Sequence, residues 1–415
     1  MRALNAASPY LRGKVDIMAG FRTLDQADVK GKRVLLRVDL NVPTENGKVT
    51  DLTRIKRAAD TINELADKGA KVILLAHFGR PKKGPDAKYT LKPVADTVAE
   101  VIKRPVAFAG DCIGPVAEKA VAAMKPGDVL CLENTRFHPE EEKNDPAFVE
   151  ALAKLGDIWV NDAFSAAHRA HATTEGLGHK LPAYAGRSMQ AELDALGRAL
   201  EAPQRPVAAV IGGAKISGKL DLLGNLLEKV EVLIIGGGMA NTFLAAQGHP
   251  IGKSLSESDL VPTARDILAK AKATDREIVL PVDVVVAQKF EANAPTRVVD
   301  VDRVGADDMI LDIGPRSIEY AVSSLARMKT VVWNGPLGAF ETAPFDVGTV
   351  QVAEAAAERS ATGRLVTVAG GGDTVAALNH AGAADRFTYI STAGGAFLEW
   401  LEGKALPGVE ILRVK

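Results

Sequence analysis

The chain has 415 residues, of which 47% are hydrophobic and 25% charged. Its 51 basic residues are balanced by 52 acidic ones, and a net charge of −1 argues against a general nucleic-acid binder or a polybasic membrane binder. The chain is too long for one ordinary hydrophobic core, so we expect two domains of roughly 200 residues each.

Targeting and redox features are few. Residues 1–20 lack the apolar core of a signal peptide, and no stretch approaches the roughly 18 apolar residues that span a bilayer. We therefore expect a disordered N-terminal extension and a cytoplasmic protein. Cys112 and Cys131 lie in no C-x-x-C motif, so we predict two buried thiols, with neither a disulfide framework nor a zinc site.

Short runs of Val, Ile and Leu alternate with amphipathic stretches along the whole chain. The amphipathic stretches predict helices over 53–69, 93–103, 148–156, 220–230 and 346–361. Continuous apolar strands separated by helices are typical of a parallel sheet covered on both faces. Because the pattern repeats after the middle of the chain, we expect two α/β units joined by an amphipathic helix within 186–206.

In the first half of the chain, the apolar runs end in basic, acidic and amide side chains. These side chains, with the start of one helix, are Arg37, Asp39, Asn41, Arg54, His77, Arg80, Arg136, Asp162, His168 and Arg169. Ligands bind at the carboxyl ends of parallel strands, and guanidinium groups bind anions through several N–H donors. A lone arginine there is commonly a solvated or capping residue. Five together favour a site for a ligand that bears phosphate and carboxylate, with the two aspartates orienting guanidinium groups.

In the second half, the runs end in glycine and lysine. The segment from Gly213 to Lys219 fits G-x-x-x-x-G-K, but Leu220 stands where a P-loop needs Ser or Thr, so we reject a P-loop. If a helix has begun by Lys215, this residue and Lys219 share one helical face and suit a transferring phosphoryl group. The alternative is a pair of solvated surface lysines.

Another glycine-rich turn, AGGGDTVAAL over 369–378, follows another apolar run. Its free amides and the helix dipole favour phosphate, and Asp373 can reach a phosphate-bound Mg²⁺. A structural glycine turn with an aspartate cap is the alternative. The segments 236–243 and 333–341 are weaker examples of the same pattern.

Together these segments resemble the phosphoglycerate kinase family from Phe21 to the C-terminus. The matching segments, in order, are RVDLNVP, HFGRP, ENTRFH, DAFSAAHRAH, GGAKISGK, GGGMANTF, WNGPLGAFE, GGGDT and STAGGAFLE. Departures from the common pattern occur at Phe78, Ser165, Ala166, Tyr389 and Ala393. None of them removes a charged ligand contact.

The resemblance implies two Rossmann-like three-layer α/β domains, with parallel sheets facing across a cleft and a helical hinge between them. The implied ranges are 21–200 for the N-terminal domain, 201–388 for the C-terminal domain, and 389–415 for a tail that returns to the N-terminal domain. The implied reaction is reversible transfer of a phosphoryl group from 1,3-bisphosphoglycerate to ADP, giving 3-phosphoglycerate and ATP. It proceeds by direct in-line transfer on domain closure, in a monomer without nucleic-acid or membrane partners.

The resemblance also implies roles for individual residues. The 3-phosphoglycerate site comprises Asp39, Asn41, Arg54, His77, Arg80, Arg136 and Arg169. The MgADP or MgATP site comprises Gly213, Ala214, Lys215, Lys219, Gly237, Gly238, Phe290, Leu311, Asn334, Glu341, Gly370, Gly371, Gly372, Asp373 and Thr374. Transfer is assigned to Arg54, Lys215, Lys219, Gly371 and Gly372, and Mg²⁺ to Asp373.

Two other functions stay open from the residues themselves. One is a kinase that forms an acyl phosphate on a different acid, and the other is a catalytically silent nucleotide-binding protein. Broken lysine or arginine sets would favour the silent protein, but both sets are intact. No histidine–aspartate–serine set or G-x-G-x-x-G segment suggests acyl-enzyme or dinucleotide chemistry.

Overall fold

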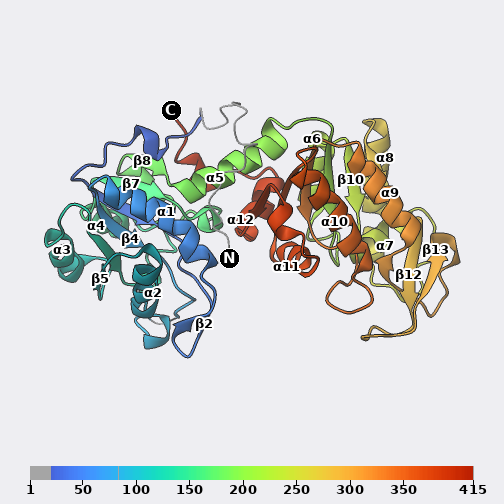
Figure 1. The fold of residues 1–415 in the computed structure, drawn as a ribbon, viewed down its shortest axis with the longest axis horizontal. Coiled ribbons are helices and arrows are strands. Elements are labelled where there is room, and N and C mark those ends of the chain that lie inside the picture. Colours follow the sequence, from blue (N-terminus) through green and yellow to red (C-terminus); the bar gives the residue numbers. More distant parts are fainter. Residues whose placement is uncertain (1–19, 83, 415) are drawn as a thin grey trace. The chain divides into compact units, whose positions relative to one another are not determined.

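The computed structural model describes residues 20–82 and 84–414, so all but the last residue of the extension expected over residues 1–20 lies outside the described residues. The described chain forms two compact units (Figure 1). The N-terminal unit comprises 20–194 and 405–414, and the C-terminal unit comprises 195–404. Among the described residues, no helix is both long and apolar enough to cross a bilayer. The cytoplasmic location stays a prediction.

The N-terminal unit is built on a six-stranded parallel sheet in the order β5-β6-β4-β1-β7-β8. Its strands are β1 (Arg33–Arg37), β4 (Lys71–Leu75), β5 (Val106–Ala109), β6 (Val129–Leu132), β7 (Ile158–Asn161) and β8 (Ala183–Ala185). Its helices are α1 (Thr53–Asp67), α2 (Lys92–Ile102), α3 (Gly114–Ala122) and α4 (Pro146–Ala153), and β2 (Thr44–Glu45) with β3 (Lys48–Val49) forms a hairpin. The predicted helices over 53–69, 93–103 and 148–156 are confirmed with shifted ends.

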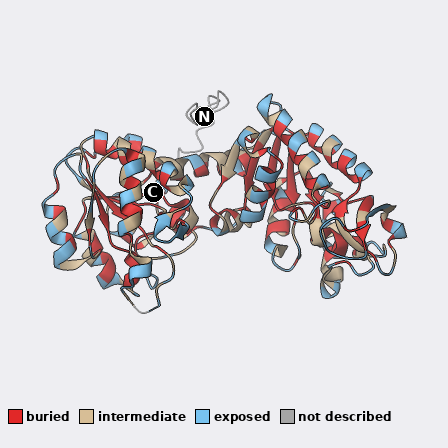
Figure 2. Ribbon diagram, turned by 60° about the horizontal axis from the view of Figure 1, so that its bottom comes forward, coloured by how far each residue is buried: buried red, intermediate tan, exposed pale blue. Residues whose placement is uncertain are grey.

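Burial explains why these segments form a sheet covered by helices. Leu35 on the central strand is fully buried and pairs with Ile73 on one side and Trp159 on the other. Helix α1 buries Ile55 and Ile62, seven residues apart, on the face that packs into a core with Val34 and Leu36 of β1. In Figure 2 the strands are almost wholly buried, whereas the helices alternate buried and exposed residues.

The C-terminal unit repeats this architecture with a parallel sheet in the order β11-β10-β9-β15-β16-β17. Its strands are β9 (Val207–Ile211), β10 (Val232–Ile235), β11 (Glu277–Val279), β15 (Thr330–Asn334), β16 (Val366–Gly370) and β17 (Tyr389–Ser391). Its helices are α6 (Leu220–Lys229), α7 (Gly237–Ala246), α8 (Val261–Ala273), α9 (Pro315–Ala326), α10 (Val347–Ala361), α11 (Gly372–His380) and α12 (Gly395–Leu401). Each unit is a Rossmann-like α/β domain, as expected.

An antiparallel sheet in the C-terminal unit was not predicted. It consists of β12 (Asp283–Ala287) between β13 (Arg297–Asp300) and β14 (Met309–Ile313). Strand β13 has no buried residue and lacks the apolar run that marks the strands of the two parallel sheets. This sheet matters because β14 supplies one wall of the cavity described below.

The segment between the units is helical, as predicted within 186–206. It consists of α5 (Arg187–Leu196) and a π-helical turn, Gly197–Glu201. Asp162, after β7, accepts a hydrogen bond of 3.0 Å from the Met189 amide in the first turn of α5. Asp162 therefore caps this helix instead of orienting one of the strand-end arginines, which was its expected role.

The returning tail is shorter than the expected 389–415. Strand β17 pairs with β16, and α12 packs against α6, so both belong to the C-terminal unit. Only residues from 405 onward group with the N-terminal unit. There, α13 (Pro407–Glu410) is fixed by a hydrogen bond of 2.8 Å from the Gly408 amide to the Ala167 carbonyl.

Candidate functional site

In the N-terminal unit, Asp39 organises one part of the predicted anion site. Its carboxylate accepts hydrogen bonds from the Asn41 amide at 3.1 Å and from Arg54 Nη1 at 3.2 Å. Ser165 Oγ donates to the second carboxylate oxygen at 2.5 Å. Arg54 Nη1 also donates to the Asn41 carbonyl at 2.7 Å. The guanidinium at the start of α1 is thus held beside the end of β1 while staying half-exposed.

The loop that follows β4 is held between two other predicted residues. Asn41 Oδ1 accepts from the Gly79 amide at 2.8 Å, and Arg136 Nη1 donates to the Gly79 carbonyl at 3.0 Å. Arg136 is 9% exposed and forms an ion pair of 3.1 Å with Glu142. The ends of β1, β4 and β6 are therefore linked at one edge of the sheet.

Positive charge gathers around His77 at this edge. Burial, together with the charges of Arg37, Arg136, Arg169 and His171, holds the pKa of His77 well below its usual value. The imidazole is therefore neutral. A neutral ring among guanidinium groups suits a hydrogen-bond donor better than a general base.

The last two predicted arginines are held less tightly. Arg169 Nε donates to His168 Nε2 at 3.1 Å, and Arg169 is half-buried. Arg80 is exposed. Burial lowers the pKa of Arg136, and the charges of Arg169 and Arg80 act in the same direction. Electrostatics thus place both arginines near Arg136, where an anion would relieve the repulsion among like charges.

In the C-terminal unit, Lys219 links the ends of three strands. Its Nζ donates to Asn334 Oδ1 at 2.6 Å and to the Gly212 carbonyl at 2.7 Å. Asn334 Nδ2 in turn donates to the Gly370 carbonyl at 2.8 Å. Burial lowers the pKa of Lys219 to about 8, although the nearby Asp373 opposes that shift. A buried ammonium with a lowered pKa is typical of a functional group.

The structure does not bring Lys215 onto a shared helical face with Lys219. Helix α6 begins only at Leu220, and residues 212–219 form a non-helical loop. Glu257 fixes this loop by accepting hydrogen bonds from the Ile216 amide at 2.5 Å and the Ser217 amide at 3.0 Å. The condition for the shared face is therefore not met, and Lys215 is an exposed side chain.

The glycine-rich turn after β16 opens helix α11. Gly371 has a φ of +99°, and a Cβ there would lie 2.6 Å from Asn334 Nδ2. Thr374 Oγ1 accepts from the Gly335 amide at 2.8 Å, which ties the helix start to the loop after β15. The first amides of a helix have no partner within the helix, so those of α11 form an anion-binding edge.

A cavity of about 650 Å³ opens beside this edge. Such a volume lies within the range of sites for small organic ligands. The predicted nucleotide residues among its lining are Gly213, Ala214, Gly237, Gly238, Phe290, Leu311, Glu341 and Asp373. Lys215, Lys219, Asn334, Gly370, Gly371, Gly372 and Thr374 do not line it; all but the exposed Lys215 gather around Asn334 and the start of α11.

Several lining residues were not predicted from the sequence, among them Leu255 and Asn241. Leu255 and Phe290 are 54% and 59% exposed, and both line the cavity, yet only Phe290 was predicted. Asn241, in α7, also lines it and donates to the Leu255 carbonyl at 3.0 Å. Leu255 stands alone in the polar stretch KSLSESD, which carries no periodic signal.

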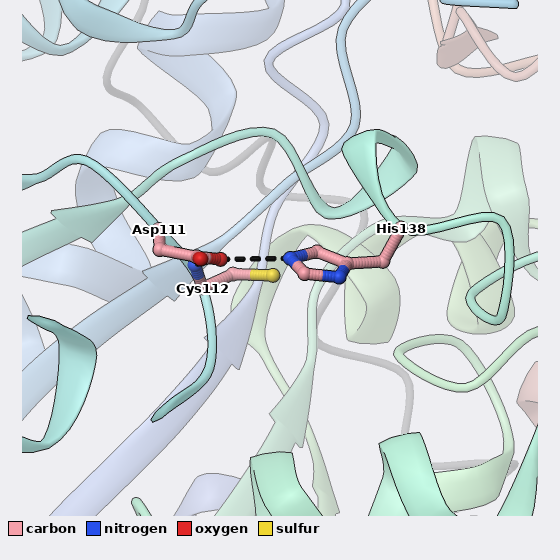
Figure 3. Close-up of side chains that lie close together, drawn as sticks. All are labelled: Asp111, Cys112 and His138. Atoms are coloured by element: carbon pink, nitrogen blue, oxygen red, sulfur yellow. Dashed lines mark hydrogen bonds and ion pairs between the residues drawn. The ribbon is translucent and has the colours of Figure 1, made fainter. Parts of the chain in front are cut away.

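Asp111, Cys112 and His138 form a separate cluster in the N-terminal unit (Figure 3). Their possible ligand atoms lie within 4.8 Å of one another. His138 Nε2 and Asp111 Oδ1 are already joined by a hydrogen bond of 2.7 Å, and burial raises the pKa of the Cys112 thiol well above its usual value. The cluster is therefore explained by a hydrogen bond between His138 and Asp111 beside a buried thiol. Cys131 is also a buried free thiol, as predicted.

Comparisons with known proteins show the family of this chain. The family model described as phosphoglycerate kinase matches residues 24–404. The phosphoglycerate kinase of Rhodopseudomonas palustris is 70% identical over 95% of this chain and 99% of its own length, and that of Bradyrhizobium diazoefficiens is 68% identical over the same shares.

Solved structures give the same result. Phosphoglycerate kinase from Coxiella burnetii superposes with a TM-score of 0.89 at 41% identity, covering 94% of this chain and 98% of the other. The enzyme from Pyrococcus horikoshii gives a TM-score of 0.78 at 32% identity over the same shares. The chain belongs to the phosphoglycerate kinase family.

Proposed function

We propose that this chain transfers a phosphoryl group reversibly between 1,3-bisphosphoglycerate and ADP, with the acid on the N-terminal unit and the nucleotide on the C-terminal unit. The observation that carries the proposal is the presence of two different anion sites on one chain. One is an arginine set around a neutral His77, and the other is a glycine-lined cavity beside Lys219 and α11. Because a single chain carries both sites, the proposal needs only a monomer.

We assign the binding of 3-phosphoglycerate to side chains of the N-terminal unit. Arg80, Arg136 and Arg169 hold its phosphate through charge-assisted hydrogen bonds, and His77 adds a neutral donor. Asp39 and Asn41 accept from and donate to the remaining polar groups while they hold Arg54 in place. We assign Arg54 to bind the migrating phosphoryl group, because its guanidinium is half-exposed and is oriented by Asp39.

The nucleotide is bound mostly by backbone and apolar surface. Its base fits the cavity between Phe290, Leu311 and the glycines of α7. Glu341 lines the same cavity and is assigned to the ribose. Its phosphates meet the first amides of α11 and the Lys219 ammonium. Lys215, exposed on the loop before α6, is the second ammonium that we assign to the transferring group.

The residues present fit a magnesium ion on the nucleotide. Asp373, in the first turn of α11, offers an exposed carboxylate that lines the cavity, and Mg²⁺ prefers such hard oxygen ligands beside phosphate oxygens. When bound, the ion neutralises charge on the phosphates. Asp373 is the one residue to which we assign it.

The chemistry needs no general base. The acceptor is an ionised oxygen in either direction, namely a phosphate oxygen of ADP or the carboxylate of 3-phosphoglycerate. Catalysis then rests on alignment and on charge stabilisation by Arg54, Lys215, Lys219 and the amides of Gly371 and Gly372. Because the two sites lie on different units, direct in-line transfer requires an arrangement of the units in which the two ligands meet.

A coupled assay tests the proposal. The protein is supplied with ATP, Mg²⁺ and 3-phosphoglycerate, and excess glyceraldehyde-3-phosphate dehydrogenase converts the product with oxidation of NADH. We expect NADH oxidation that depends on both ATP and the acid, and folded protein that gives no signal would overturn the proposal. Because this dehydrogenase reports only 1,3-bisphosphoglycerate, other carboxylic acids are compared by the release of ADP, and faster release with another acid would reassign the substrate.

A further inference from the structure

Arg37 is the last residue of β1 and lies beneath the arginine set instead of in it. Its side chain is 2% exposed, so an anion at the sheet edge cannot reach it directly. Its Nε donates to Thr173 Oγ1 at 3.0 Å, and its Nη1 donates to the Val38 carbonyl. The remaining nitrogen, Nη2, lies 2.7 Å from His77 Nδ1.

The direction of this last hydrogen bond is fixed by chemistry. A guanidinium carries only donors and stays protonated in proteins, so His77 Nδ1 must be the acceptor. A neutral ring that accepts at Nδ1 carries its proton on Nε2. Protonation of Nδ1 would set two N–H groups against each other and add a charge beside Arg37, Arg136 and Arg169. Within the described residues, Nε2 has no partner and keeps its donor available.

A buried network holds the Arg37 guanidinium in this orientation. Glu141 is 1% exposed and accepts hydrogen bonds from the Thr173 hydroxyl and from the Thr173 amide, the latter at 3.2 Å. Since the hydroxyl oxygen of Thr173 accepts from Arg37 Nε, its own proton is left for Glu141. Glu141 also supplies a counter-charge for the buried guanidinium. A chain of hydrogen bonds thus runs from His77 through Arg37 and Thr173 to Glu141. In each of these bonds only one of the two atoms can be the donor.

We propose that Arg37 is a positioning residue that fixes His77 as the neutral Nε2–H tautomer, so that His77 presents a donor to the phospho-acid without adding a titratable charge. This inference rests on the proposed acid site. If the inference holds, protonation of His77 does not change the affinity for 3-phosphoglycerate near neutral pH. The other charged groups facing His77 are Arg136, Arg169 and His171. His171 itself titrates below this range, because burial lowers its pKa to about 4.

The tautomer is measured directly on the wild-type protein. Histidine labelled with ¹⁵N gives separate long-range correlations for Nδ1 and Nε2, and these report which nitrogen is protonated. Between pH 5.5 and 8, we expect His77 to stay neutral with its proton on Nε2. A proton on Nδ1, or titration of His77 within that range, would overturn the inference.

Variants then test the role of Arg37. In Arg37→Met we expect the pKa of His77 to rise toward its ordinary value, although burial and the other neighbouring charges still hold it down. We also expect the KM for 3-phosphoglycerate to rise about tenfold at pH 7.5, the usual effect of one hydrogen bond, and to recover in part as the pH falls and His77 gains charge. The kcat should change much less. An unchanged tautomer with a normal KM would contradict the proposal.

Two further variants guard against a general loss of structure. Arg33→Met removes an arginine from the opposite end of β1, where it pairs with Asp157 at the surface, and should leave the tautomer and the KM unaltered. Thr173→Val keeps Arg37 and His77 but removes the hydroxyl between Arg37 and Glu141, and should weaken the tautomer preference in the same direction as Arg37→Met. No change in Thr173→Val would count against the network.

The spectrum is recorded without substrate, so it separates this inference from the proposed function. A proton on Nδ1 overturns the role of Arg37 and leaves the reaction standing. Absence of phosphoryl transfer in the coupled assay overturns the proposed function, whichever tautomer is found.

Discussion

The two units share one architecture and solve the problem of holding an anion in different ways. At the end of the central strand β1 of the N-terminal unit, charged side chains hold other side chains of the site. Arg37 is hydrogen-bonded to His77, and Asp39 is hydrogen-bonded to Arg54. At the end of the corresponding central strand β9, the C-terminal unit continues into Gly212, where a Cβ would lie 1.7 Å from the Pro336 carbonyl oxygen. The sheet edge of the N-terminal unit carries guanidinium groups. The sheet edge of the C-terminal unit carries glycines, which leave room for the close approach of backbone.

The difference follows from what each ligand offers. A small phospho-acid has little apolar surface, so its recognition depends on many charged donors that surround it. A nucleotide offers a large base and a chain of phosphates, so it gains from an apolar cavity and from backbone amides that approach closely. Side-chain donors must be buried beside one another, and burial first, then neighbouring positive charges, lowers the pKa values of His77 and Arg136. Backbone donors carry no such cost.

The strongest test of the comparison concerns Arg54, the one arginine assigned to the moving phosphoryl group. In Arg54→Ala we expect kcat to fall by about 10²–10³, the usual cost of losing one donor to a transition state. Binding of 3-phosphoglycerate should stay measurable, because the other arginines are intact. Steady-state kinetics measure the fall in kcat, and calorimetric titration with 3-phosphoglycerate measures the remaining affinity.

Lys56→Ala, an exposed residue on the same helix, is the matched control and should behave as wild type. Near-normal turnover in Arg54→Ala would remove the arginine from the transfer step and leave it as a structural partner of Asp39.

The next largest effect is expected for Lys219→Met. The lysine joins Asn334 and Gly212, so the change removes both a charge on the phosphoryl group and a link between strand ends. We expect kcat to fall by about 10²-fold, with a smaller rise in the KM for the nucleotide. Lys229→Met, at the other end of α6, is the control. An effect confined to the nucleotide KM would make Lys219 a binding residue only.

The lowered pKa of Lys219 predicts an alkaline limit to catalysis. Because burial lowers that pKa to about 8, the ammonium loses its charge as the pH rises through 8. The kcat/KM for ADP should therefore fall above pH 8, by up to tenfold per pH unit. In Lys219→Arg, whose guanidinium does not titrate, overall activity is lower but the fall should disappear. A wild-type profile that stays flat to pH 9.5 would contradict this assignment.

The smallest effect tests the backbone side of the comparison. Gly371→Ala introduces a side chain at a φ of +99° and 2.6 Å from Asn334 Nδ2. We expect the free energy of unfolding to fall by more than about 1 kcal/mol and the KM for ADP to rise. Gly224→Ala, inside α6 with open space around it, should be neutral or stabilising. Equal thermal stability of the two variants would argue against a strained turn at Gly371.

Much of the fold could be predicted because its signals are local. The alternation of apolar runs and amphipathic stretches placed the helices within a few residues, as for α1 and α10. Strand ends meet at one edge of a parallel sheet, so basic residues far apart in the chain, such as Arg136 and Arg169, could be grouped from the sequence alone.

What could not be predicted depends on tertiary contacts. The exposed strand β13 lacks an apolar run, and Leu255 becomes part of a cavity wall only because α7 and its following loop are folded. The start of α6 at Leu220 depends on Glu257, a residue 40 positions from Ser217, which holds the preceding loop out of the helix. Asp162 looked like a partner for arginine until α5 supplied an amide for it.

The central claim is that the acid binds to side chains of one unit and the nucleotide to the other unit. Separate calorimetric titrations of 3-phosphoglycerate and ADP into wild type, Arg169→Met and Lys219→Met test it most directly. We expect Arg169→Met to weaken 3-phosphoglycerate by about 10- to 100-fold and to leave ADP unchanged, and Lys219→Met to weaken ADP alone. A variant that weakens both ligands equally, or the opposite ligand, would contradict the account.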